Sequence, residues 1–134
     1  MSEPQQNLER ASQLKVLVAE DGLLHQRLAM RLLENAGHAV TIASNGREAL
    51  EALRHNNFDL VLMDVEMPEM DGIRATQAIR AEERHGARVP IVAVTATGDP
   101  RACLHAGMDD WLPKPLSISR LNQTLDKVLA KTAA

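Results

Sequence analysis

The chain has 134 residues, 45% of them hydrophobic and 25% charged, which suffices for one domain with its own core and is too little for two. A formal net charge of -3, one Phe and one Trp argue against a nucleic-acid partner, because such binders need a basic surface or aromatic platforms. The single cysteine, Cys103, excludes an intrachain disulfide and favours a reducing cytoplasm, and the apolar runs are far shorter than the roughly 18 residues that span a membrane.

Short β-branched and apolar runs alternate with stretches of helical period, which predicts βα units around a parallel sheet with helices on both faces. Residues 1–13 fit no such unit and are interpreted as a linker or tail, before a domain at 14–131 and a frayed end at 132–134. The predicted strands are Lys15–Ala19, Ala39–Ala43, Asp59–Met63, Pro90–Val94 and Asp110–Leu112. The first, third and fourth are apolar almost throughout, which is typical of central strands.

The first two helices are predicted from apolar spacing and from turn residues. Leu24, Leu28 and Leu32 lie four residues apart and predict one inward stripe on a helix that Gly37 ends. The second helix is expected from about Arg47 to Arg54, directly after an Asn-Gly turn.

The last three helices are marked by end signals. One is expected from Ile73 to Glu83, with Ile73, Thr76 and Ile79 inward and Gly86 at its end. The next begins at Asp99-Pro100, an N-cap followed by proline, and ends at Gly107. The C-terminal helix begins at Ser117 or Ser119, and it places Leu121, Leu125, Val128 and Leu129 inward and Lys127 and Lys131 in solvent.

Charged and polar residues follow the predicted strands where each strand ends. Glu20-Asp21 follows the first, Asp64 the third, Thr95 the fourth and Lys114 the fifth. Ligands of open parallel sheets bind at this edge, and three carboxylates there repel one another unless a cation relieves them. Oxygen ligands alone favour a hard ion, so the sequence predicts a site for Mg²⁺, which Mn²⁺ would also fit.

An aspartate in this setting is a plausible nucleophile toward a phosphoryl group. Lys114 and the metal ion would stabilise the phosphoryl oxygens, and Thr95 would donate a hydrogen bond to one of them. The segment after Asp64 contains Met67-Pro68 and Asp71-Gly72, a turn-rich loop that can leave the nucleophile open to a large donor. The residues therefore indicate phosphoryl transfer to Asp64.

Several separated motifs together resemble one known family. They are the run VLMDVEMPEMDG at 61–72, Glu20-Asp21 before it, and Val94-Thr95-Ala96 and AGMDDWLPKP at 106–115 after it. This set resembles the response-regulator receiver domain of two-component signalling. The resemblance covers residues 14–131 and implies a flavodoxin-like (βα)5 fold, a doubly wound parallel sheet with strand order 2-1-3-4-5.

The resemblance also implies roles for single residues. Asp64 would be the phosphoacceptor, Asp21 a direct Mg²⁺ ligand, Glu20 a ligand acting mainly through water, and the backbone carbonyl of Glu66 a further ligand. The phosphate-binding lysine would be Lys114.

Three further positions complete the family pattern. Thr95 corresponds to the switch hydroxyl and Trp111 to the aromatic switch position, and together they would reshape the face formed by the last strand and its flanking helices. Pro115 follows the lysine through a peptide bond that is cis in this family.

By the same resemblance, a phosphohistidine on a histidine kinase or a histidine phosphotransfer domain would donate the phosphoryl group. No independent enzyme is expected beyond self-phosphorylation and autodephosphorylation. The motifs look most like receivers of hybrid sensor histidine kinases, which would make this chain an excised cytoplasmic domain of such a kinase. A stand-alone single-domain response regulator is the alternative.

Two departures from the family pattern concern the site and the output face. Gly22 and His25 stand where the family often has Asn, close to the expected metal. The segment 95–99 is about three residues shorter than in many relatives, which puts partner choice through that face in doubt.

Other interpretations stay open from the residues alone. Glu20-Asp21 could cap a helix, Lys114 could be a solvated charge, and Trp111 could be a core residue. An aspartyl-phosphate phosphatase would need an acid/base Asp two residues after the nucleophile, where this chain has Glu66. A receiver acting only as a scaffold would normally lose the lysine or part of the acidic set.

Overall fold

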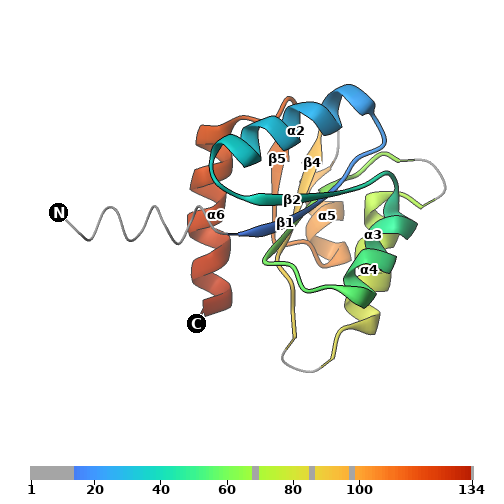
Figure 1. Cartoon of the computed structure of the whole chain (residues 1–134). Helices are drawn as coiled ribbons and strands as arrows, with labels where there is room; N and C mark the ends of the chain where they lie inside the picture. Colours follow the sequence, from blue (N-terminus) through green and yellow to red (C-terminus); the bar gives the residue numbers. More distant parts are fainter. Residues whose placement is uncertain (1–13, 68–69, 85–86, 97–98, 134) are drawn as a thin grey trace.

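The computed structural model describes residues 14–67, 70–84, 87–96 and 99–133. Five parallel strands form one sheet in the order β2-β1-β3-β4-β5, with helices on both faces (Figure 1). The strands are β1 (Lys15–Ala19), β2 (Ala39–Ala43), β3 (Leu60–Asp64), β4 (Ile91–Thr95) and β5 (Asp110–Pro113). The helices are α2 (Leu23–Asn35), α3 (Gly46–His55), α4 (Gly72–Glu82), α5 (Pro100–Ala106) and α6 (Ile118–Ala133). This architecture confirms the expected fold and strand order.

Two aliphatic cores fill the space between the sheet and its helices. Alternate strand residues point to opposite faces, so Leu17 joins the core under α3, α4 and α5, whereas Val16 and Val18 join the core under α2 and α6. The three strands expected at the centre, β1, β3 and β4, are buried along nearly their whole length. Burial on both faces fixes these strands, and the polar residues at their ends are therefore held in register.

Three strands differ from the prediction by one residue: β3 and β4 begin and end one residue later, and β5 ends at Pro113 and not at Leu112. Strand β3 begins at Leu60 because Asp59 lies before it, where its carboxylate accepts a hydrogen bond from the Lys15 N–H at 2.8 Å. Strand β4 begins after Pro90, which lacks an N–H to donate to a ladder. At the other end, Asp64 and Thr95 are the last residues of β3 and β4 and not the first residues after them.

Helix ends follow the side-chain signals in the sequence. The Asn45 side chain caps α3 by accepting from the Glu48 N–H at 2.8 Å, and Asp71 caps α4 by accepting from the Arg74 N–H at 2.8 Å. Asp99 caps α5 in the same way, and Gly107 ends it with a φ of 111°, a left-handed conformation that favours glycine.

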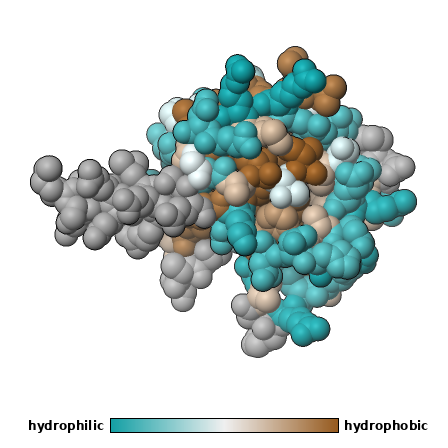
Figure 2. All heavy atoms as spheres, viewed as in Figure 1, coloured by the Kyte–Doolittle hydropathy of each residue, from teal (hydrophilic) through white to brown (hydrophobic). Residues whose placement is uncertain are grey.

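The predicted inward stripe of α2 is wrong at its first residue. Leu24 is 79% exposed, and the buried residues of α2 are Ala29 and Leu33. A spacing of four residues turns by roughly 40° per step around a helix of 3.6 residues per turn, so the stripe winds from solvent at Leu24 toward the half-buried Leu28 and Leu32. Figure 2 shows apolar surface at the top of the molecule over α2, where Leu23 is also 64% exposed.

Other predicted inward residues are mostly confirmed. Thr76 and Ile79 of α4 are buried, and Ile73 is partly buried. In α6, Leu121, Leu125 and Val128 are buried. The predicted helix end at Gly86 and the tail at 1–13 lie outside the described residues, as do Pro68, Thr97, Gly98, Ala134 and the side chain of Lys131.

Arg80, a partly buried residue of α4, connects the start of β4 with the turn before β5. The Arg80 guanidinium donates to the Gly107 carbonyl at 2.9 Å and to the Asp109 carboxylate at 3.0 Å. The same carboxylate accepts the N–H of Ile91 at 2.8 Å. Because β5 leads directly to Lys114, this contact helps to place the site at the other end of the strands.

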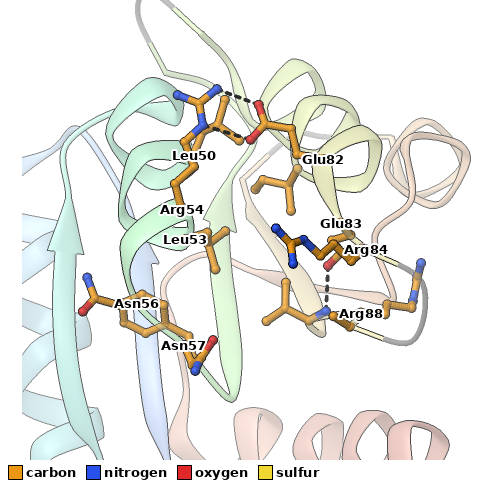
Figure 3. Close-up of a pocket in the computed structure, with 13 residues that line it drawn as sticks. Leu50, Leu53, Arg54, Asn56, Asn57, Glu82, Glu83, Arg84 and Arg88 are labelled. Atoms are coloured by element: carbon orange, nitrogen blue, oxygen red, sulfur yellow. Dashed lines mark hydrogen bonds and ion pairs between the residues drawn. The ribbon is translucent and has the colours of Figure 1, made fainter.

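The amino ends of the strands border a cavity of about 640 Å³ between α3 and α4. An ion pair joins the two helices at this cavity: Arg54 Nε and Nη2 lie 2.9 and 2.6 Å from the two carboxylate oxygens of Glu82 (Figure 3). The cavity therefore lies at the amino ends of the strands, whereas the predicted site lies at their carboxyl ends. No helix in the described part of the chain is long and apolar enough to cross a bilayer.

We expect the stability of the protein to fall in mild acid because of His38. The side chain is 5% exposed, its Nδ1 has no hydrogen-bond partner among the described residues, and burial lowers the pKa of the imidazole. The unfolded chain therefore takes up a proton near pH 6.5 before the folded one does. The free energy of unfolding should fall below that pH by up to about 1.4 kcal/mol per pH unit, until the lowered folded pKa is reached.

Urea unfolding of the wild type and of His38→Leu between pH 8 and pH 5 checks this expectation. The difference between the two curves isolates His38 from every other titrating group. His105→Leu, a change at an exposed position of α5, is the matched control and should follow the wild type. Parallel curves for His38→Leu and wild type would contradict the prediction.

Candidate functional site

Three carboxylates meet at the carboxyl edge of the two neighbouring central strands β1 and β3. Glu20 and Asp21 directly follow β1, and Asp64 ends β3, which pairs with β1 through Ala19 and Met63. Each of the three side chains offers an oxygen within 4.8 Å of the others. Glu20 and Asp64 are buried and Asp21 is exposed, so the group opens to solvent on the side of Asp21.

One ammonium group lies between the two buried carboxylates. Lys114 Nζ is 2.9 Å from Glu20 Oε1 and 3.1 Å from Asp64 Oδ2. Lys114 follows β5, two strands away from β3, and its long side chain reaches across the edge of the sheet. The structure thus brings together side chains from three places that lie far apart in the sequence: the Glu20-Asp21 pair, Asp64 and Lys114.

Burial and charge act in opposite directions on this group. Burial raises the pKa of Asp64 to about 6, with a contribution from the negative charge of Glu20, although Lys114 opposes the change. Burial would raise the pKa of Glu20 too, but hydrogen bonds from the Gly22 N–H and from Lys114 outweigh it and lower that pKa. Burial disfavours the Lys114 ammonium, and its two carboxylate partners outweigh this and raise the pKa of Lys114.

The backbone after Asp64 folds closely over the carboxylate. The Glu66 N–H donates to Asp64 Oδ1 at 3.2 Å, while the Glu66 side chain is exposed. A Cβ atom on Gly72 would lie 2.2 Å from the Asp64 carbonyl oxygen, so only glycine fits there. The loop after β3 can therefore close directly against the strand end that carries Asp64.

Thr95 lies on β4, which is next to β3, and Trp111 lies on β5, on the far side of β4. Thr95 ends β4 and is buried, and its carbonyl accepts a hydrogen bond from the Lys114 N–H at 3.1 Å. The peptide bond between Lys114 and Pro115 is cis. Trp111 pairs in register with Ala93 and is 39% exposed, so it is a surface residue and not part of the core.

The two residues that depart from the family pattern near the expected metal, Gly22 and His25, both contact Glu20. The Gly22 N–H donates to Glu20 Oε2 at 2.9 Å, and His25 Nδ1 lies 3.8 Å from the same oxygen. The exposed His25 therefore lies beside the three carboxylates, on the side of Glu20. Of the shortened segment 95–99, Thr97 and Gly98 lie outside the described residues.

Sequence reasoning missed two residues that hold the backbone of the site. Gln26 Nε2 donates to the carbonyl of Glu20 at 2.6 Å, and the Gly46 N–H donates to the carbonyl of Met70 at 3.1 Å in the loop after β3. A Cβ atom on Gly46 would lie 2.4 Å from that carbonyl oxygen. The Asn-Gly turn before α3 was a visible signal for Gly46, whereas no motif pointed to Gln26.

The donor set fits a hard divalent cation. Three carboxylates carry three negative charges when ionised, and Lys114 supplies one positive charge. Oxygen ligands of this kind, with an open side for water, are the ligands that Mg²⁺ prefers. A buried carboxylate beside such an ion and a lysine can act as a nucleophile toward a phosphoryl group.

Comparison with known proteins agrees with this chemistry. The family model of the response regulator receiver domain matches residues 16–126. The chain is 44% identical over 131 residues to the sensor histidine kinase GacS of Pseudomonas protegens, covering 94% of this chain and 14% of that protein. It is 39% identical over 110 residues to the hybrid signal transduction protein dokA of Dictyostelium discoideum, covering 82% of this chain and 7% of that protein. The chain thus spans a small part of these relatives.

Two solved structures share the fold and bear on ligands and partners. The receiver domain of the sensor histidine kinase PA1611 of Pseudomonas aeruginosa, with a magnesium ion coordinated in its active site cleft, matches with a TM-score of 0.79 and 37% identity, covering 87% of this chain and 98% of that one. The receiver domain of the yeast response regulator Ssk1, crystallised with the histidine phosphotransfer protein Ypd1, matches with a TM-score of 0.79 and 27% identity, covering 92% of this chain and 93% of that one.

We expect Lys114→Met to destabilise the protein most strongly at pH 8, where the carboxylates around it are ionised. Removing one partner of a buried ion pair typically costs about 3–5 kcal/mol, and the Lys114 side chain is 15% exposed. The loss should be smaller near pH 5, where Asp64 takes up a proton. Millimolar Mg²⁺ should restore more stability to the variant than it adds to the wild type.

Thermal unfolding at both pH values, with and without Mg²⁺, measures these differences. Lys127→Met is the matched control, because Lys127 is 69% exposed and lies 3.6 Å from Asp110, an arrangement that contributes little. Equal losses for the two lysine variants, or a loss that does not depend on pH, would speak against a central role of Lys114.

Proposed function

This chain belongs to the response-regulator receiver domain family, and we propose that it accepts a phosphoryl group on Asp64 from a phosphohistidine in a two-component phosphorelay. The observation that carries the proposal is the position of Lys114 Nζ, 3.1 Å from Asp64 Oδ2, beside the three carboxylates. This arrangement offers a nucleophile, a cation site and a fixed positive charge at one strand edge. A stable core alone would not require any of the three.

We assign a metal-binding role to the acidic group. Asp21 and Asp64 would bind Mg²⁺ directly, Glu20 mainly through water, and the backbone carbonyl of Glu66 would add a fourth protein ligand. The exposed Asp21 leaves room for the water molecules that Mg²⁺ retains. When bound, the ion supplies positive charge that offsets the carboxylates and the incoming phosphoryl oxygens. Mn²⁺ would fit the same oxygen ligands.

The transfer step follows from the geometry of Asp64. One of its carboxylate oxygens attacks the phosphorus atom, and an O–P bond forms as the P–N bond to the donor histidine breaks. The electron pair of that bond leaves with the imidazole nitrogen. Lys114, already within 3.1 Å of Asp64, would bind a phosphoryl oxygen, and the Thr95 hydroxyl would donate to another.

The phosphorylated state would be read through a shift between two conformations. The acyl phosphate adds about two negative charges next to Glu20 and draws Lys114 and Thr95 toward it. Trp111, 39% exposed on β5, would then move inward and change the face formed by α5, β5 and α6. Both conformations exist before phosphorylation, and the modification changes their populations.

The donor would be a histidine kinase or a histidine phosphotransfer domain. Leu23 and Leu24 open α2 one residue after the Glu20-Asp21 pair and are 64% and 79% exposed. Large exposed apolar side chains beside a reactive group are typical of a docking surface. The similarity to GacS favours an origin within a hybrid sensor kinase and a cytoplasmic location, with a stand-alone response regulator as the alternative.

We expect wild-type protein to gain the mass of one phosphoryl group when incubated with acetyl phosphate and Mg²⁺. Asp64→Asn should gain none, because the amide is not a nucleophile toward phosphorus. Intact-mass spectrometry measures the change, and a chelator in place of Mg²⁺ should abolish it. Asp59→Asn, at an exposed position before β3, is the matched control and should be modified like the wild type. Phosphorylation that survives in Asp64→Asn would falsify the assignment.

We expect Leu24→Ser to slow transfer from a phosphorylated histidine phosphotransfer protein by about tenfold. Burial of a leucine side chain contributes roughly 1.5–3 kcal/mol, of which a docking contact recovers a part. Transfer from acetyl phosphate should not change, because this small donor needs no docking surface. Leu104→Ser is the control, since Leu104 is 52% exposed on α5. Rapid-quench kinetics with both donors separate docking from chemistry, and equal slowing with both would contradict the docking role.

A further inference from the structure

Two of the three carboxylates lie on a short connection without regular structure. Residues 20–22 link β1 to α2, and they place Glu20 and Asp21 beside Asp64. Like charges at this distance repel, and a connection outside helix and sheet could rotate to separate them. Something must therefore hold the backbone of this connection in place.

Gln26 contacts the connection at both ends. Its side-chain Nε2 donates to the Glu20 carbonyl at 2.6 Å, and its backbone N–H donates to the Gly22 carbonyl at 2.9 Å. The same Nε2 lies 3.4 Å from Ser44 Oγ, just after β2. The Gln26 side chain is half-buried on the first turns of α2, so helix α2 itself carries the restraint.

The Glu20 backbone is fixed on both sides by these contacts. The Glu20 N–H donates to the Ala43 carbonyl at 2.9 Å, as a continuation of the pairing between β1 and β2. On the other side, the bond from Gln26 fixes the plane of the Glu20-Asp21 peptide. The orientation of that plane decides the direction in which the Asp21 side chain leaves the backbone.

We propose that Gln26 is a positioning residue for the cation and phosphoacceptor site, acting through its hydrogen bond to the Glu20 carbonyl. This inference rests on the proposed function, because it assumes that Asp21 binds the cation. Gln26 is neutral, so it places the carboxylates without adding charge to them. Partners that orient ligating carboxylates typically contribute about 10–100-fold to metal affinity.

Gln26→Met tests the proposal, because methionine keeps the length of the side chain and removes the donor. Titration calorimetry should show Mg²⁺ binding weakened about tenfold or more. The melting temperature without Mg²⁺ should stay close to that of the wild type, since Gln26 is only half-buried and water can take the place of its donor. Amide chemical shifts of residues 20–22 should change. Gln77→Met, the same substitution at an exposed position of α4, should leave affinity and shifts unchanged.

Each result has a distinct meaning. Wild-type affinity in Gln26→Met overturns the positioning role and leaves the proposed function intact. A wild-type protein that binds no Mg²⁺ overturns the proposed function together with this inference. Affinities are compared at a temperature where circular dichroism shows every variant folded, so a loss of affinity in Gln26→Met without unfolding supports the proposal.

Discussion

The mutual repulsion of Glu20, Asp21 and Asp64 is the constraint on which the rest of the structure depends. Their oxygens lie within 4.8 Å of one another, and the Lys114 ammonium lies 2.9 Å from Glu20 and 3.1 Å from Asp64. Without a rigid support this arrangement would relax by moving the carboxylates apart or by protonating one of them. Burial, with a contribution from the negative charge of Glu20, raises the pKa of Asp64 to about 6, so the site disfavours a further buried negative charge. A divalent ion or a phosphoryl group bound there would change the electrostatic energy of the whole edge.

The sheet supplies the support. Strands β1 and β3 are adjacent and buried, so their ends cannot separate without opening both aliphatic cores. Individual contacts hold the connections beyond the strand ends. Gln26 donates a hydrogen bond to the Glu20 carbonyl, and the absence of a side chain at Gly72 allows the loop after β3 to approach the Asp64 carbonyl. At the amino ends of the strands, Asp109 accepts hydrogen bonds from Arg80 of α4 and from the N–H of Ile91 in β4, and these bonds hold the turn before β5, the strand that precedes Lys114. Fold stability and site geometry thus depend on the same buried strands.

Sequence patterns predicted these elements to different degrees. Strands β1 and β2 lie where the apolar runs placed them, and Asp99 and Gly107 bound α5 as capping residues do. The wrong predictions concern positions that are decided by contacts with other segments. Asp59 was expected in β3 and lies before it, and Leu24 was expected to be buried and faces solvent. Periodicity shows that a helix has an apolar side, but the packing of α2 on the sheet decides which residues fill it.

The sequence by itself determined the βα alternation, the polar residues at the strand ends and the motifs that resemble receiver domains, because all of these are written in local order and spacing. The tertiary structure alone decided that Lys114 lies between Glu20 and Asp64, that Gln26 holds the Glu20 carbonyl and that Gly72 must lack a side chain. Those contacts bring atoms of different segments within a few ångströms of one another, and they can form only once the strands are paired in register. Local sequence specifies the groups, and the packed sheet specifies the geometry in which their charges meet.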